Sequence, residues 1–467
     1  MTNVPRRISV GLMSAGRSRT RCTTRPGTSA GRAGAPRLRA GIASAACLIL
    51  AACTAAPGFP AATSGPQAGQ AGTNVVKIGV ELPMSGADAP NGVPTLNGVR
   101  LAIADINAAG GIDGYKFGVN SQDDAVNGSD NPQQGARNIT TLVKDTSVVG
   151  VVGPFNSTVA EAEIPISNAA GLLQCSPSNT FPGLTEPWGG VDPRTYRPTH
   201  PDEIAYVRVA PTDDYQGLAG AAIAYQDIGA RRAYVLDDTL TFGVGLANVF
   251  ATDFEKMGGT VVKHDAAGPN VTDFRVLLRA AMALNPDVVY YGGVTAGGGG
   301  LLRKQMVEAG MANIPFVGGD GIHDGPSSAA NSFLNLAGAQ GDPDTYSTVA
   351  APRDIPNAGA FAAKYHAAYG KDPGKYSASA YACTQIILDA FRHAGKPYRA
   401  AVRQYIVSGA SFDTVLGMVT FDANGDTNQK IISEYTFDPT FDGGDWAFVK
   451  QVDFGESSGG SPTPAGN

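Results

Sequence analysis

Short apolar runs rich in β-branched residues alternate with stretches of helical periodicity from about residue 75 onward. Residues 148–152 are apolar throughout, as expected of a strand that is buried on both faces of a sheet. Residues 95–109 instead carry apolar side chains at helical spacing, and Gly110 and Gly111 follow where a helix would end. Further strands are predicted at residues 75–80, 171–175, 206–209, 233–236, 260–262, 288–291 and 315–317.

This alternation of strand and helix occurs twice, before and after a proline-rich stretch at residues 187–201. It is typical of parallel, doubly wound sheets, so the chain is expected to form two α/β lobes. Residues 357–408 have a mostly helical pattern, and the Asn-Gly pair within residues 422–426 predicts a hairpin turn. Ligands of such sheets bind beyond the carboxyl ends of the strands, which predicts a cleft between the lobes.

The length of 467 residues is too great for one hydrophobic core and agrees with two lobes. Charge is unevenly distributed, because residues 1–52 contain nine arginines but no lysine and no acidic residue. Subtracting these nine from the 35 basic residues of the chain leaves 26, against 41 acidic residues. This acidic excess disfavours nucleic acid as a partner.

The amino-terminal segment has the organisation of an export signal. Its apolar run at residues 40–50 follows an arginine-rich part and is too short to span a bilayer stably. The sequence LAAC at residues 50–53 resembles the lipobox of bacterial lipoproteins, in which the cysteine is acylated and becomes the new amino terminus. We therefore expect a signal peptide at residues 1–52, lipidation at Cys53, and an extracytoplasmic protein that the lipid anchors to the cell membrane.

Two alternatives remain for this segment: a plain signal peptide, and twin-arginine export through Arg6 and Arg7. Translation could start at Met1 or at Met13.

Residues 53–73 are rich in Ala, Gly, Pro, Ser and Gln, which predicts a flexible tether, and residues 456–467 predict a disordered tail.

Two further cysteines, Cys175 and Cys383, lie in an apolar strand pattern and an apolar helix pattern. Export would permit a disulfide between them. Their apolar surroundings favour two buried free thiols instead.

Several short motifs follow one another in a characteristic order. They are LPMSG at 82–86, ADINAAGGI at 104–112, QDD at 122–124, VGP at 152–154, SPSNT at 176–180, YYGG at 290–293, GDG at 319–321 and FDANGD at 421–426. In this order they resemble the periplasmic leucine/isoleucine/valine-binding proteins of ABC importers, and the resemblance covers about residues 75–450.

The resemblance implies a type I periplasmic-binding fold, in which two doubly wound α/β lobes are joined by three hinge crossovers. The crossovers are expected near Arg208, near Ala351 and Pro352, and at residues 425–429. The first lobe would comprise residues 74–207 and 352–424, and the second residues 208–351 and 425–455. The resemblance also implies a monomer that binds an amino acid, branched-chain or similar, and delivers it to the permease and ATPase subunits of an importer.

The resemblance carries over to individual residues. Ser157 and its neighbouring backbone amides would hold the ligand α-carboxylate at a helix amino terminus, where unpaired N–H groups and partial positive charge favour an anion. Asn156, just before it, is also expected to bind the ligand. A carbonyl at Ser178 and the hydroxyl of Thr180 would accept hydrogen bonds from the ligand ammonium. Simple helix capping by Ser157 and turn formation by the SPSNT motif are the structural alternatives.

Asp320, followed by Gly321, stands where the branched-chain binders have a glutamate against the ligand ammonium. A carboxylate there would supply a charge-assisted hydrogen bond, although it is one methylene shorter. An Asp-Gly turn is the alternative. The resemblance places the pocket for the ligand side chain at Asn91, Phe155, Phe242, Val294 and Tyr376, each of which could instead belong to the core.

The sequence offers little that favours catalysis or a cofactor. The glycine-dense residues 292–300 lack the Gly-Lys-Ser/Thr of a phosphate loop, and the five histidines are scattered. We expect a binding protein rather than an enzyme, without cofactor or metal. Other hypotheses are a binding protein for a small aromatic acid, an amide or urea, a sensory ligand-binding ectodomain, and a hydrolase with an unrecognised site.

Overall fold

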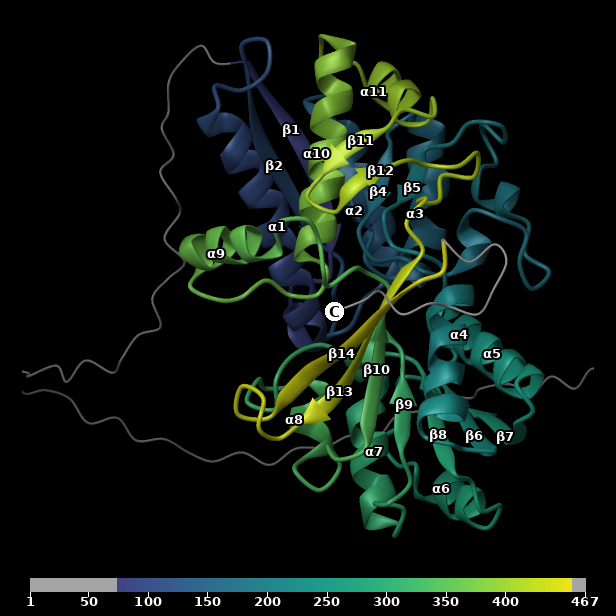
Figure 1. Cartoon of the computed structure of the whole chain (residues 1–467). Helices are drawn as coiled ribbons and strands as arrows, with labels where there is room; N and C mark the ends of the chain where they lie inside the picture. Colours follow the sequence, from purple (N-terminus) through teal and green to yellow (C-terminus); the bar gives the residue numbers. More distant parts are fainter. Residues whose placement is uncertain (1–73, 456–467) are drawn as a thin grey trace, which may run out of the picture. The chain divides into compact units, whose positions relative to one another are not determined.

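The computed structural model describes residues 74–455, which form two α/β lobes, each built on its own sheet (Figure 1). The predicted signal peptide, the lipidation of Cys53, the tether and the carboxyl-terminal tail lie outside these residues. Within residues 74–455, no helix combines the length and the apolar composition that crossing a membrane requires.

The first lobe contains a five-stranded sheet, drawn in the upper part of Figure 1, whose strands are all parallel. Its order is β2-β1-β3-β4-β5. The strands are β1 (Asn74–Leu82), β2 (Tyr115–Asp123), β3 (Val148–Val152), β4 (Gln174–Ser176) and β5 (Tyr206–Arg208). Every residue of β3 is buried, which agrees with its apolar sequence and with helices on both faces.

The second lobe contains a seven-stranded sheet in the order β14-β13-β10-β9-β8-β6-β7. Five of its strands are parallel to one another: β6 (Arg232–Asp237), β7 (Thr260–Ala266), β8 (Val288–Gly292), β9 (Phe316–Gly318) and β10 (Thr345–Val349). The long hairpin of β13 (Ile431–Asp438) and β14 (Asp445–Asp453) pairs antiparallel with β10. The sequence pattern predicted β6, β7, β8 and β9, but it predicted neither β10 nor this antiparallel edge.

Helices cover both sheets. Those packed in the first lobe are α1 (Ala89–Ala108), α2 (Pro132–Lys144), α3 (Ser157–Ala170), α9 (Ala358–Tyr369), α10 (Ser377–Ala394) and α11 (Arg399–Ile406). Those packed in the second lobe are α4 (Asp213–Ala222), α5 (Thr241–Lys256), α6 (Arg275–Met282), α7 (Gly299–Glu308) and α8 (Phe333–Ala337). A small antiparallel pair, β11 (Phe412–Thr414) and β12 (Gly417–Val419), joins the apolar core of the first lobe.

The predicted helix at residues 95–109 begins earlier than its apolar pattern indicates. α1 starts at Ala89 and includes two prolines. Pro90 occupies the first turn, where its missing N–H is tolerated, and Pro94 lies inside the helix. The carbonyl of Pro94 accepts hydrogen bonds from the hydroxyls of Tyr365 in α9 and Ser377 at the start of α10, so both helices are fixed against α1 at this point.

The chain passes between the sheets after β5, after β10 and before β13. Two of these passages meet, because Arg208 at the end of β5 bridges to Asp426 in the predicted turn. Their side chains form a buried ion pair of 2.5 Å, and Arg208 is fully buried. Gly425 has a φ of +95°, and a Cβ there would lie 2.5 Å from the carbonyl oxygen of Tyr206, so the turn requires glycine at this position.

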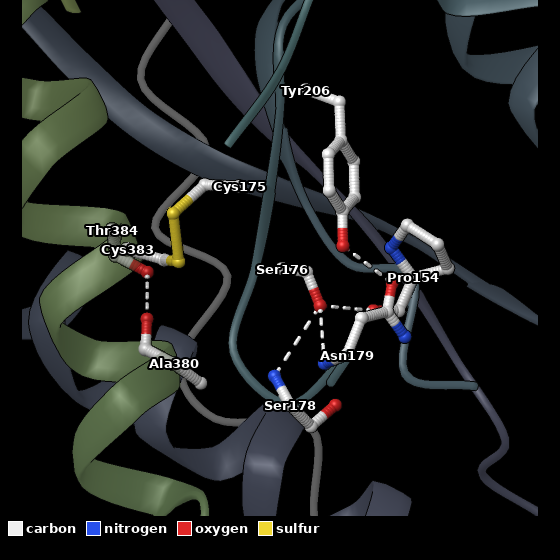
Figure 2. Close-up of a disulfide and its surroundings, with 9 residues drawn as sticks. All are labelled: Pro154, Cys175, Ser176, Ser178, Asn179, Tyr206, Ala380, Cys383 and Thr384. Atoms are coloured by element: carbon white, nitrogen blue, oxygen red, sulfur yellow. Dashed lines mark hydrogen bonds between the residues drawn. A yellow bond between two sulfur atoms is a disulfide. The ribbon is translucent and has the colours of Figure 1, made fainter. Parts of the chain in front are cut away.

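The expectation of two free thiols is wrong: Cys175 and Cys383 form a disulfide with a Cα–Cα distance of 5.6 Å (Figure 2). Both cysteines are buried in the apolar core, as their sequence surroundings indicate. However, α10 packs against β3 and β4, which brings Cys383 opposite Cys175 across 208 residues of sequence. Apolar surroundings therefore do not distinguish a free thiol from a disulfide, and tertiary packing decides the outcome.

Candidate functional site

A cavity of about 30 Å³ lies where the carboxyl ends of strands from both sheets meet. It is lined by Asp88, Asn91, Phe155, Asn156, Ser157, Ser178, Thr180, Phe242, Val294, Asp320, Gly321 and Lys375. These residues include every ligand residue expected from the sequence except Tyr376. A cavity of this volume holds roughly two water molecules, so the two lobes nearly meet here and would have to separate somewhat to hold a larger ligand.

The start of α3 forms one wall of the cavity. Gly153 follows β3 with a φ of +131°, and a Cβ there would lie 2.2 Å from the carbonyl oxygen of Glu81. The glycine thus lets the chain pass close to β1 before α3 begins at Ser157, as the sequence predicted. The first intrahelical bond is donated by the Ala160 N–H to the Asn156 carbonyl, so the preceding N–H groups of the helix have no partner within residues 74–455 and can bind an anion.

Asn156 adds an acceptor beside this helix terminus. Its side-chain oxygen is buried and has no hydrogen-bond partner among residues 74–455. A buried polar atom without a partner is costly in a folded protein. Asn156 also lines the cavity, so a ligand donor would satisfy it.

The loop after β4 forms the adjacent wall, and the hydroxyl of Ser176 organises it (Figure 2). This oxygen donates to the carbonyl of Pro154 at 2.8 Å and accepts from the N–H of Asn179 at 2.9 Å. The Ser178 hydroxyl donates to the carbonyl of Phe155 at 2.9 Å. Ser178 is therefore fixed next to the start of α3, two residues beyond the end of the strand that contains Cys175, and Thr180 follows in the same loop.

Asp320 lies on the opposite side, in the turn after β9. Its Oδ1 accepts from Nε2 of Gln216 at 2.8 Å, and its Oδ2 accepts from the hydroxyl of Tyr376 at 2.7 Å. A carboxylate has about four acceptor positions, so both oxygens can still accept from a ligand. Tyr376 itself is buried behind Asp320, which explains why it holds that carboxylate in place without lining the cavity.

Two charged residues of the cavity wall, Asp88 and Lys375, were missed in the sequence analysis. Burial raises the pKa of Asp88 to about 7, and the neighbouring Asp130 contributes to this shift. Burial lowers the pKa of Lys375, although Asp320 and other carboxylates partly oppose it. Asp88 follows the carboxyl end of β1, so the strand-end rule could have identified it, whereas Lys375 lies in the turn between α9 and α10, where no sequence pattern distinguishes it.

The apolar part of the wall is small. Phe155 packs edge-on against the ring of Tyr376 with centroids 5.6 Å apart. Phe242, in the first turn of α5, lies close beneath Gly319 and Gly321. Val294 completes this apolar part from the loop after β8.

Direct hydrogen bonds join the lobes at two places beside the cavity. On one side, Tyr376 and Lys375 both donate to Asp320, Lys375 to its backbone carbonyl. On the other, the hydroxyl of Thr241 in α5 donates to Glu161 in α3 at 3.0 Å. The lobes are thus closed around the cavity.

The residues at this site do not form a metal centre, since residues 74–455 contain no group of three or more His, Cys, Asp or Glu side chains able to hold an ion. The arrangement instead places anion-binding N–H groups and a carboxylate on opposite walls. Such a pair of walls suits a ligand that carries both an anionic and a cationic group.

Comparison with known proteins shows the family of this chain. Residues 75–437 match the model of a family described as periplasmic binding protein. An amino acid binding protein from Pseudomonas aeruginosa is 30% identical over 365 residues, which cover 77% of this chain and 88% of that protein.

Solved structures show the same fold. The leucine-binding protein LivK from Thermotoga maritima has a TM-score of 0.68 and 24% identity, over 80% of this chain and 98% of that one. A solute-binding protein from R. palustris in complex with 4-hydroxybenzoate has a TM-score of 0.67 and 19% identity, over 81% and 96% of the two chains. The fold alone therefore does not identify the ligand.

Proposed function

Because this chain belongs to the periplasmic binding protein family, as a substrate-binding protein of the branched-chain amino acid ABC transporter type, we propose that it binds an amino acid between its lobes and delivers it to an importer. The observation that carries the proposal is the placement of Ser157 and Asp320 on opposite walls of one cavity. An α-amino acid has a carboxylate and an ammonium on one carbon, and these two walls complement them.

In this proposal the α-carboxylate binds at the start of α3, where the free N–H groups and the Ser157 hydroxyl donate to it. The ammonium lies between the lobes and donates to Asp320, to the Thr180 hydroxyl and to the Ser178 carbonyl. Because these acceptors belong to different lobes, one ligand would stabilise the closed arrangement over an open one. The permease and the ATPase would then respond to the closed protein.

The proposal also concerns where in the cell the protein acts. The family consists of periplasmic binding proteins, which act outside the cytoplasm. Acylation of Cys53 within LAAC would hold the protein at the membrane through its lipid. Residues 53–73 would then give the lobes reach toward the permease.

Isothermal titration against the L-amino acids and their deaminated analogues tests the binding proposal. Removing one partner of a buried ion pair costs about 3–5 kcal/mol. Since each 1.4 kcal/mol corresponds to a tenfold change in affinity, Asp320→Ala should weaken amino-acid binding by roughly two to three orders of magnitude. Asp354→Ala, which removes an exposed carboxylate that forms an ion pair with Arg353, is the matched control and should bind as the wild type does.

The deaminated analogues separate this proposal from a binder of small acids. They lack the ammonium, so they should bind the wild-type protein weakly and lose little affinity in Asp320→Ala. If a deaminated or aromatic acid is the tighter ligand, or if Asp320→Ala binds the amino acid unchanged, the amino-acid proposal is wrong.

A further inference from the structure

Lys375 brings a cation to the cavity, where Asp320, Asp324 and Asp88 act on it electrostatically but none of them forms an ion pair with it. Its ammonium donates to the backbone carbonyl of Asp320 and lies 5.6 Å from the centroid of the Tyr376 ring. Among residues 74–455, no carboxylate oxygen lies within the 4.0 Å of an ion pair with this ammonium. An ammonium has three donors, so part of its hydrogen-bonding capacity is available to a ligand.

The carboxylate of Asp320 does not form an ion pair with the ammonium of Lys375. Both of its oxygens are bonded to Gln216 and Tyr376, and Lys375 contacts only the main chain of the same residue. In the proposed function, the remaining acceptor positions of Asp320 serve the ligand ammonium. The positive charge of Lys375 is therefore additional to what the amino and carboxyl groups of an amino acid require.

Asp88 and Asn91 make the neighbouring wall polar as well. Asp88 is 4% exposed, and its Oδ2 accepts from the N–H of Asp130 at 3.1 Å. The side-chain amide of Asn91 has no hydrogen-bond partner among the described residues, although it lines the cavity. This wall, formed by Lys375, Asp88 and Asn91, offers donors and acceptors where a branched-chain binder needs hydrocarbon.

We propose that the ligand is an amino acid whose side chain ends in a carboxyl or carboxamide group, and that Lys375 determines this specificity by binding the side-chain oxygen. Asn91 can donate to the same group. Asp88 can accept from a carboxamide, or donate to a carboxylate when it is protonated. This inference rests on the proposed function and restricts its substrate class.

A branched aliphatic side chain fits this wall poorly. It would exclude water from the ammonium of Lys375 and offer no acceptor in exchange, and burying a charge without a partner is costly. A site built to hydrogen-bond its substrate strongly rejects an analogue that lacks the bonding group. Aspartate, asparagine and leucine all branch at Cγ and have similar volumes, so they differ mainly in the chemistry that Lys375 would sense.

Titration of the purified protein with L-aspartate, L-asparagine, L-glutamate, L-glutamine and L-leucine tests the inference. At least one of the first four should bind more tightly than leucine. A hydrogen bond to a charged group contributes about 1.5–3 kcal/mol, so Lys375→Met should weaken that ligand by roughly 10- to 100-fold. The same variant should bind leucine as well as the wild type or better, and Lys375→Arg should retain most of the preference.

The melting temperatures of the ligand-free variants show whether each remains folded. If Lys375→Met does not fold, Lys375→Arg provides a second measurement, because this variant keeps a cation and should still bind the preferred ligand more tightly than leucine. Tightest binding of leucine, or an equal loss for leucine and for the preferred ligand in Lys375→Met, would overturn the inference and leave the proposed function intact. If none of the L-amino acids binds, the proposed function fails and this inference fails with it.

Discussion

The hydroxyl of Tyr376 donates a hydrogen bond of 2.7 Å to Oδ2 of Asp320, and this bond joins the two lobes. Tyr376 immediately precedes α10 in the first lobe, whereas Asp320 follows β9 in the second. The bond can form only when the lobes are closed, and it orients the carboxylate toward the cavity. It therefore couples the position of a candidate ligand group to closure.

Tyr376→Phe should weaken ligand binding without unfolding either lobe. The loss of a hydrogen bond to a charged acceptor costs about 1.5–3 kcal/mol, which corresponds to roughly a 10- to 100-fold lower affinity. Isothermal titration measures this change, and small-angle scattering at saturating ligand should still show compaction. Tyr365→Phe is the matched control, because its hydroxyl bonds to Pro94 within the first lobe and its loss should leave the affinity unchanged. Equal affinities of Tyr376→Phe and the wild type would contradict the coupling.

Replacing both cysteines of the disulfide, Cys175→Ser with Cys383→Ser, should lower the stability of the first lobe. The disulfide closes a loop with a sequence separation of 208 residues, and bonds of this kind contribute about 2–4 kcal/mol. The double variant should melt at a lower temperature than the oxidised wild type. A reducing agent should destabilise the wild type and leave the double variant unaffected. Identical melting temperatures under oxidising conditions, or free thiols at both positions in peptide mass spectrometry, would show that the disulfide does not form.

Glu81 and Glu163 are fully buried in the first lobe, and we expect them to make stability depend on pH. Burial raises the pKa of both carboxyl groups well above 4.5, and each has an oxygen without a hydrogen-bond partner among the described residues. For an acid with a raised pKa, the folded state binds more protons than the unfolded state between the two pKa values. The contribution to stability is therefore complete below pH 4.5 and is lost as the pH rises through the folded pKa.

Glu163→Gln should reduce this pH dependence, because the amide keeps the shape of the side chain and cannot ionise. Two neighbouring acidic residues add to these shifts, because Asp123 raises the pKa of Glu81 further and Asp124 raises the pKa of Glu163. Melting curves at a series of pH values above 4.5 should fall less steeply for the variant than for the wild type. Glu161→Gln, which changes a partly buried residue of the same helix, should keep the wild-type slope. If the melting temperature falls equally steeply with pH in Glu163→Gln and in the wild type, the two glutamates do not cause the pH dependence of stability.

Cys53→Ala should release the protein from the membrane or block its processing, since the proposed acylation needs the thiol. Fractionation of bacterial cells that express the full-length chain measures this outcome. Ala52→Gly retains a small residue before the cysteine and serves as the control, with membrane association expected to persist. If the Cys53→Ala protein sediments with membranes as the wild type does, the lipobox interpretation is wrong.

The sequence by itself determined many of the strands and helices of the fold and most of the cavity wall. The apolar residues 148–152 predict β3, and the start of α3 at Ser157 follows from the chain pattern and the family resemblance, because these features depend on neighbours along the chain. The strand-end rule and the resemblance together also bring Ser157, Thr180 and Asp320 to one cavity. Parallel sheets gather the carboxyl ends of distant strands at one edge, so local information suffices for this prediction.

Only the tertiary structure decided which distant side chains meet. Burial of Cys175 and Cys383 could be read from their apolar neighbours, but their pairing depends on how α10 packs against β4. Lys375 lies among residues without a distinctive pattern and reaches the cavity because Tyr376, beside it, is fixed against Asp320 of the other lobe. A disulfide and a specificity-determining cation depend on contacts of a few ångströms between segments that only folding brings together, and hydrophobic periodicity carries no information about such contacts.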